Sequence, residues 1–67
     1  MIDSKRIKVR MIELDISQRE LARSTGVGLN HINEVINNKV SPRLELVDKI
    51  SIALNLGLLE KREIFLP

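Results

Sequence analysis

Three asparagines and a glutamate recur at helical spacing in one short stretch of this chain. At about 100° per residue they fall on one face of a helix, opposite an apolar stripe. The polar face holds Asn30, Asn33, Glu34 and Asn37, and the stripe holds Leu29, Ile32, Val35 and Ile36. A carboxamide can pair with both N6 and N7 of adenine in the major groove, and a carboxylate can accept from the amino group of cytosine. The polar face is therefore suited to contacting base edges.

The alternative is that the polar face is an ordinary solvated surface. Asparagine costs a helix roughly 0.5 kcal/mol per residue, because its amide competes for the backbone, and solvated faces more often carry Lys, Glu or Gln. Three asparagines on one face therefore favour recognition over solvation. His31, on the flank, has no cysteine or carboxylate at metal-ligand spacing, so no metal site is expected.

Polar and basic residues around this stretch are candidates for phosphate contact. Helix N-termini favour phosphate oxygens, which points to the residues that open the preceding helix, and two cations bracket the connection that follows. The candidates are Ser17, Gln18, Asn37, Lys39 and Arg43. For the charged groups, a solvated surface role is an equally good interpretation.

The elements that must position these groups form a helix-turn-helix over about residues 17–37. Ser17 and Glu20 are spaced as a capping box, which satisfies two helix-terminal amides. Gly26 can adopt the left-handed conformation that ends a helix, and Val27 turns back to the core. The second helix of this motif, which is the third helix of the chain, should run from Gly28 to about Asn37. An ordinary helical hairpin shares these signals.

The rest of the chain predicts further helices and a strand content near zero. Asp3 or Ser4 caps a first helix that ends near Leu14, with Ile7 and Met11 facing inward. Ser41 and Pro42 open another, ending near Asn55, whose core face is Leu44, Val47, Ile50 and Leu54. The tail, 57–67, is either a short fifth helix or ends in an edge strand. Residues 1–67 should form one all-α domain of four or five helices.

Composition restricts the possible functions. With 67 residues and 43% hydrophobic content, the core is small and dimerisation would stabilise it. One aromatic residue leaves no stacking platform for single strands, and the absence of cysteine excludes disulfides and thiolate metal sites. No apolar run approaches the roughly 20 residues of a membrane span. We expect a soluble, cytoplasmic protein without a secretory signal. Net charge is only +2, but residues 1–10 hold four cations against one acid.

The sequence resembles the Cro/cI or Xre type of helix-turn-helix regulators. Their pattern Gln-x-x-Leu-Ala-x-x-x-Gly-Val is present as Gln18, Leu21, Ala22, Gly26 and Val27, and the match extends from about Arg6 to Asn55. The resemblance implies a four- or five-helix domain that inserts its third helix into the major groove, usually as a homodimer on a palindromic operator. It implies base contacts at Leu29, Asn30 and Glu34, to which the polar face adds Asn33. It implies phosphate contacts at Gln18, Lys39 and Arg43.

Four positions depart from the family pattern. Gly28 stands where members often carry a capping Ser or Thr. Met11 and Ile36 replace an arginine and a glutamate that commonly pair, an exchange that keeps stability because both charges are lost together. Leu29 replaces a polar base contact, so its side chain either packs inside or contacts a thymine methyl group, and we expect it to pack inside.

These patterns predict a double-stranded DNA-binding transcriptional regulator, expected to repress, with no cofactor and no evident small-molecule ligand. We expect a homodimer through the fourth helix and the tail, because eight apolar residues exceed what one small core needs: Leu46, Ile52, Leu56, Leu58, Leu59, Ile64, Phe65 and Leu66. The alternative is a protein-binding module, such as an antitoxin or adaptor, with the same fold. One histidine, no cysteine and no clustered carboxylates argue against an enzyme.

Overall fold

The computed structural model describes residues 2–65, which form five helices and no strand. The helices are α1 (Ser4–Glu13), α2 (Gln18–Thr25), α3 (Leu29–Ile36), α4 (Leu44–Ala53) and α5 (Leu58–Phe65). The all-α prediction is confirmed. Of the two alternatives for the tail, the helix is correct as far as Phe65, and the last two residues lie outside the described part.

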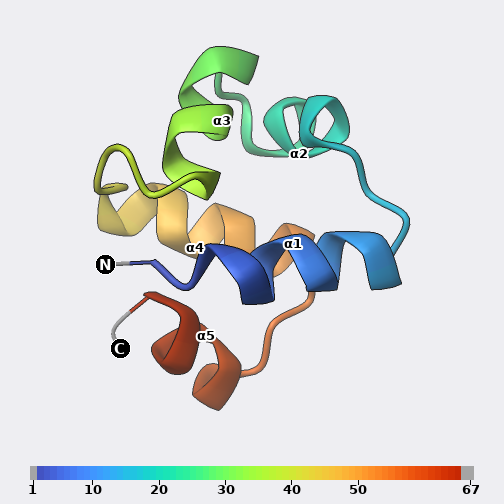
Figure 1. The fold of residues 1–67 in the computed structure, drawn as a ribbon, viewed down its shortest axis with the longest axis vertical. Coiled ribbons are helices and arrows are strands. Elements are labelled where there is room, and N and C mark those ends of the chain that lie inside the picture. Colours follow the sequence, from blue (N-terminus) through green and yellow to red (C-terminus); the bar gives the residue numbers. More distant parts are fainter. Residues whose placement is uncertain (1, 66–67) are drawn as a thin grey trace.

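The helices pack in tiers (Figure 1). Helices α1 and α4 cross the middle of the molecule, α2 and α3 lie together at one end, and α5 lies at the other. One hydrophobic cluster joins all five helices. Its fully buried members are Ile7, Leu21, Ile32, Ile36, Ile50, Leu54, Ile64 and Val35. The α2–α3 pair therefore stands on a core built by the other three helices.

A left-handed residue follows each of the first four helices, within two residues of its end. Gly26 has a φ of 72°, and Asp15, Asn38 and Asn55 have φ values of 55°, 60° and 53°. Asp and Asn tolerate this region better than other residues with a Cβ. After each of them the chain reverses, and the next amide donates to the carbonyl five residues back, as in the Schellman motif. Repeated C-caps of this kind set the lengths of the connections.

The start of α4 differs from the prediction. Arg43 is the N-cap, in an extended conformation with φ −71° and ψ 156°, so Ser41 and Pro42 precede the helix and do not open it. Leu44 is 72% exposed, whereas Leu46 is buried. The reason is angular: at about 100° per residue, Leu44 lies about 120° around the helix from Ile50, and Leu46 lies only about 40° from it.

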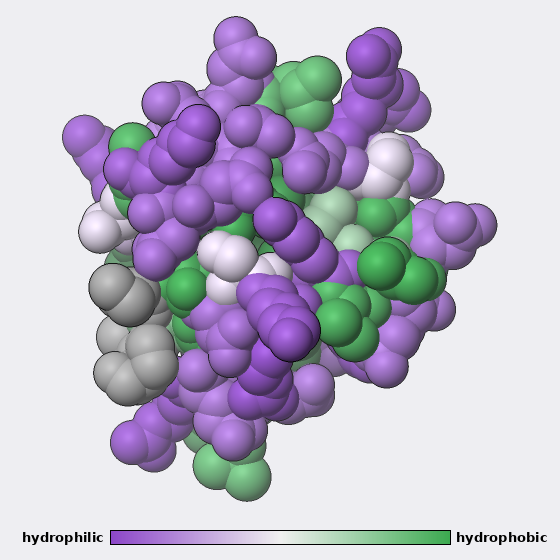
Figure 2. All heavy atoms as spheres, in the orientation of Figure 1, coloured by the Kyte–Doolittle hydropathy of each residue, from purple (hydrophilic) through white to green (hydrophobic). Residues whose placement is uncertain are grey.

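The apolar surplus predicted for a subunit contact is smaller than expected. Leu46, Ile64 and Phe65 belong to the core, and Leu56 packs against it. Three of the predicted residues are exposed, namely Ile52, Leu58 and Leu59. Leu66 lies outside the described residues. Figure 2 shows one largely hydrophilic face, with hydrophobic side chains in separate patches.

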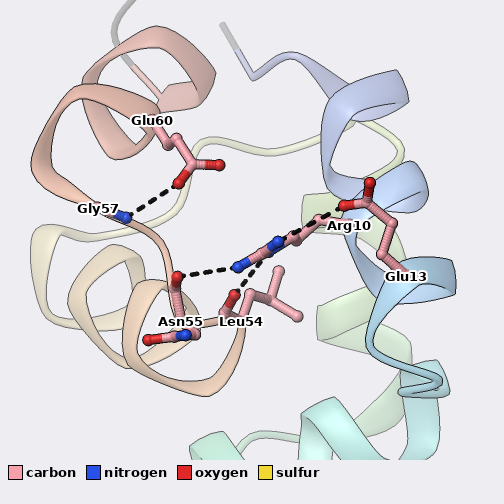
Figure 3. A network of polar contacts seen from close by, with 6 residues as sticks. All are labelled: Arg10, Glu13, Leu54, Asn55, Gly57 and Glu60. Carbon is pink, nitrogen blue, oxygen red and sulfur yellow. Dashed lines mark hydrogen bonds and ion pairs between the residues drawn. The ribbon is translucent and has the colours of Figure 1, made fainter.

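A polar network ties α1 to the end of α4 (Figure 3). The Arg10 guanidinium donates from Nε to the Leu54 carbonyl, at 3.0 Å, and from Nη2 to the Asn55 carbonyl, at 3.1 Å. Glu13 lies 3.6 Å from Nη1. Arginine here satisfies carbonyls that the end of a helix leaves without an intrahelical donor.

Candidate nucleic-acid interface

The turn between α2 and α3 has the geometry that the sequence predicted. Ser17 caps α2: its Oγ accepts from the Glu20 amide at 3.1 Å, and its own amide donates to Glu20 Oε1 at 3.0 Å. The bond from the Ser17 backbone amide is the main reason that the pKa of the Glu20 carboxyl lies below its ordinary value. Leu21 is fully buried. The capping box and the glycine turn are both confirmed.

The Thr25 hydroxyl makes hydrogen bonds to two carbonyls at the end of α2. The buried Thr25 hydroxyl donates to the Leu21 carbonyl at 2.9 Å and contacts the Ala22 carbonyl at 3.2 Å. A hydroxyl without a partner would be costly at such a site, and here it is satisfied within its own helix. The turn at Gly26 is consequently fixed from the α2 side.

Helix α3 presents the predicted polar face to solvent. Ile32, Val35 and Ile36 are completely buried, while Asn30 and Glu34 are exposed on the opposite side. The caps are Gly28, which makes no side-chain cap hydrogen bond, and Asn37. As the sequence indicated, the N-terminus of α3 therefore lacks a side-chain cap.

Leu29 was expected to pack inside, and that expectation is wrong, because its side chain is 40% exposed. It points along the same stripe as Ile36 but stands seven residues earlier, which is about 10 Å along the helix axis. At that distance it extends past the core beneath α3. Leu29 therefore belongs to the accessible surface at the start of this helix.

Hydrogen bonds join several of the candidate side chains. Asn33 Nδ2 donates to Gln18 Oε1 at 3.0 Å, which links α3 to the first residue of α2. Asn37 Nδ2 donates to the Asn33 carbonyl at 2.9 Å. The Lys8 ammonium of α1 donates to Asn37 Oδ1 at 2.8 Å. The polar face is thus bordered by side chains from three helices.

Two further cations flank this surface. Lys39 is exposed in the loop after α3, and its backbone amide donates to the Glu34 carbonyl at 2.9 Å. Arg43 and His31 line a cleft of about 260 Å³ between α3 and α4. The candidate phosphate ligands therefore flank α3: Gln18 lies beside Asn33 within the helix, and Lys39 lies beyond its end.

Lys8 is the residue that sequence reasoning did not single out. It was one of four cations in a basic N-terminal segment, and only tertiary structure distinguishes them. Arg6 pairs with Glu63 of α5 at 3.6 Å, and Arg10 is bound to the end of α4. Of these four cations, only Lys8 is hydrogen-bonded within the described residues to the end of α3, at its C-cap Asn37. Its position three residues before Met11 in α1 gave no such signal.

Neither a metal-binding cluster nor a membrane-spanning helix is present in the described residues. Residues 2–65 contain no group of three or more His, Cys, Asp or Glu side chains arranged to hold a metal ion. None of the five helices described here has the length and apolarity to cross a bilayer.

A family model described as helix-turn-helix (HTH_3) matches residues 7–61, from the first turn of α1 into α5. The chain belongs to this family, which is the Cro/cI (Xre) type of helix-turn-helix proteins. No curated protein and no solved structure matches the chain. Members of the family are DNA-binding regulators and are generally not enzymes, so this protein is a DNA-binding helix-turn-helix regulator.

Proposed function

We propose that the protein is a sequence-specific repressor that inserts α3 into the major groove of a palindromic operator and acts as a homodimer in the cytoplasm. The observation that carries this proposal is the exposed amide and carboxylate face of α3, backed by a completely buried apolar stripe. Within the described residues, the side chains of Asn30 and Glu34 make no hydrogen bond or ion pair. Their polar atoms are free for a base edge.

Each base-contacting residue has a chemical counterpart in the groove. The carboxamides of Asn30 and Asn33 suit adenine, and the Glu34 carboxylate suits the amino group of cytosine. The exposed Leu29 side chain suits the methyl group of thymine. Because α3 is only eight residues long, these four groups together span a few base pairs.

The phosphate contacts are assigned to Ser17, Gln18, Asn37, Lys39 and Arg43. The backbone amides at the start of α2 offer N–H donors, and the positive end of the helix dipole lies there. Gln18 uses its Oε1 to accept from Asn33, so its Nε2 remains as a donor for a phosphate oxygen. Lys39 and Arg43 supply charge at the other flank. Contacts of this type set register without specifying sequence.

The homodimer is assigned to α4 and the C-terminal tail. Leu44 and Leu58, each 72% exposed, line one groove of about 520 Å³ between α4 and α5, and Val47 and Pro42 contribute to it. The Cα trace measures 25 × 24 × 19 Å. Two such domains placed side by side, with their side chains, match half-sites about 34 Å apart. A second copy of the chain is the occupant we propose for this groove.

Selection from a random duplex pool at near-physiological salt tests the proposal, because specificity separates an operator protein from a nonspecific binder. We expect an enriched palindrome. The double substitution Asn30→Ala and Asn33→Ala should abolish enrichment, since each lost base contact costs about 1–3 kcal/mol. Ser24→Ala, an exposed position on the α4 side of α2, is the matched control and should leave enrichment unchanged.

Each result has a distinct meaning. An enriched but asymmetric single half-site would contradict the homodimer while keeping sequence recognition. An unenriched pool would overturn the sequence-specific function and favour the protein-binding module instead. Unfolding of the double variant would be visible by circular dichroism, so loss of binding and loss of fold are separable.

A further inference from the structure

The bonding of Lys8 differs from that of the other cations that tie α1 to its neighbours. Its ammonium donates to the neutral carboxamide oxygen of Asn37, at 2.8 Å, and the described residues provide it with no carboxylate within ion-pair distance. Arg6 and Arg10, by contrast, have Glu63 and Glu13 within 3.6 Å. A neutral amide does not cancel a charge, so Lys8 keeps its full positive charge beside the end of α3.

Asn37 is held in a defined orientation by this bond. Its Oδ1 accepts from Lys8, and its Nδ2 donates to the Asn33 carbonyl at 2.9 Å. One N–H of the amide and two of the ammonium remain, all of them donors. The pair therefore offers a positively charged cluster of donors, which suits an anionic oxygen and not a base edge that needs an acceptor.

We propose that Lys8 and Asn37 together bind one backbone phosphate of duplex DNA, so that α1 takes part in the interface. The inference rests on the proposed function. Asn37 is the C-cap of α3 and follows Asn33 and Glu34, so the pair lies at the edge of the base-contacting face, where a backbone flanking the groove would pass. Glu34, one turn before Asn37, is the acidic residue nearest to Asn37 in the sequence, and among the described residues it makes no ion pair with Lys8. The cluster extends the phosphate contacts to a third helix.

The competing explanation is that the bond simply fastens α1 to α3. The two explanations differ in their dependence on salt. A phosphate contact releases condensed counterions, and each one contributes about 0.9 to the slope of log K against log[salt] for duplex DNA. A purely structural bond between two exposed side chains contributes nothing to that slope.

The test measures binding of the full chain to a labelled duplex of random sequence, by fluorescence anisotropy over a series of salt concentrations. Such a duplex suffices because phosphate contacts dominate nonspecific binding. For Lys8→Met we expect the slope to fall by about 0.9, which is roughly a 3.5-fold difference over a fourfold change in salt. Lys8→Arg should restore the slope because it keeps the charge.

Lys5→Met is the matched control. Lys5 stands one turn earlier in α1, but it lines the groove between α1 and α5 with Glu60 and Ile64, away from α3. Its removal lowers the net charge equally and should leave the slope unchanged. Asn37→Ala should weaken binding in wild type and much less in Lys8→Met, because the two groups bind one phosphate.

The outcomes are separable. If wild type binds with a salt-dependent affinity and Lys8→Met has the same slope as wild type, the Lys8 inference is overturned and the proposed function stands. An equal fall for Lys5→Met also overturns it, because net charge alone would then explain the effect. If wild type shows no salt-dependent duplex binding, the proposed function and this inference fail together.

Discussion

Replacing the half-buried Arg10 should remove more stability than replacing any exposed residue of α1, because its guanidinium satisfies two carbonyls at the end of α4 (Figure 3). Hydrogen bonds to charged groups contribute about 1.5–3 kcal/mol each, and less at exposed sites. The Leu54 bond is part-buried and the Asn55 bond is exposed, while the cation also interacts with the α4 dipole, for about 0.3–1 kcal/mol. Together these give about 2–3 kcal/mol for Arg10→Met.

Two companion variants divide this energy. Arg10→Lys keeps the charge but not the planar fork of donors, so about half of the loss should return. Glu13→Gln should cost under about 0.5 kcal/mol, because the ion pair is 3.6 Å long and the Glu13 side chain is 58% exposed. We therefore expect the hydrogen bonds from Arg10 to the carbonyls of Leu54 and Asn55, and not the ion pair with Glu13, to supply most of the stabilisation.

Urea unfolding followed by far-ultraviolet circular dichroism measures these differences, since the chain has neither Trp nor Tyr for fluorescence. The midpoint should move without a change in slope. A small domain has only about 5 kcal/mol to lose, and each kcal/mol lowers Tm by about 4–8 °C, so the effect of Arg10→Met should be large. A change below about 0.5 kcal/mol would refute the reasoning, and so would a Glu13→Gln variant that loses as much.

Three further predictions concern α2, the turn and the start of α3. Gly26→Ala should destabilise the fold by about 1–2 kcal/mol, because the φ of 72° is strained for a residue with a Cβ, even though that Cβ would meet nothing within 4 Å. Gly28→Ser should stabilise it by about 0.5 kcal/mol, because the serine hydroxyl would cap α3. Thermal unfolding of both variants checks these opposite signs. The pKa of Glu20 is lowered by the Ser17 amide, so its contribution is present above the ordinary carboxyl pKa and lost as pH falls through the lower, folded value. Unfolding of wild type and Glu20→Gln compared across the acid range should therefore converge at low pH, and a constant difference would contradict this.

Local sequence signals located the helix-turn-helix because each acts within a few residues. The capping box at Ser17 and Glu20 and the left-handed Gly26 are decided by neighbouring backbone groups, so they survive any tertiary context. Asn38 and Asn55, the left-handed residues beyond α3 and α4, are local features of the same kind. Such features need no knowledge of what packs against the helix.

Position within the fold was harder to predict. The pattern for α4 chose Leu44 as a core residue, but Leu46 is buried instead, because it lies closer than Leu44 to the angular position of Ile50. Leu29 shares the inward angle of α3 yet extends past the core. For Leu44 the error was angular, whereas for Leu29 the angle was correct and the error came from where the core beneath α3 ends, which the sequence does not state.

The basic segment illustrates the same limit for the candidate site. From the sequence, Arg6, Lys8 and Arg10 are equivalent cations spaced along one helix. In the structure Arg6 contacts α5, Arg10 contacts the end of α4, and Lys8 contacts α3. Lys8 lies about 200° around the helix from Arg6 and so faces another neighbour, whereas Arg10 lies only about 40° around from Arg6 but one turn further along the helix. Only the arrangement of those neighbours separates a stabilising cation from one available to a partner.

The exchange at Met11 and Ile36 separates stability from recognition. Both side chains lie in the core, with 6% and 0% exposure, so α1 and α3 meet through apolar contact where an ion pair is common in the family. Apolar contact of this kind is insensitive to ionic strength, whereas phosphate contacts weaken steeply with salt. Because the core beneath α3 carries no charge at these positions, salt should change the affinity for DNA far more than the stability of the fold. Binding can then be tuned over a wide range while the platform that holds α3 stays intact.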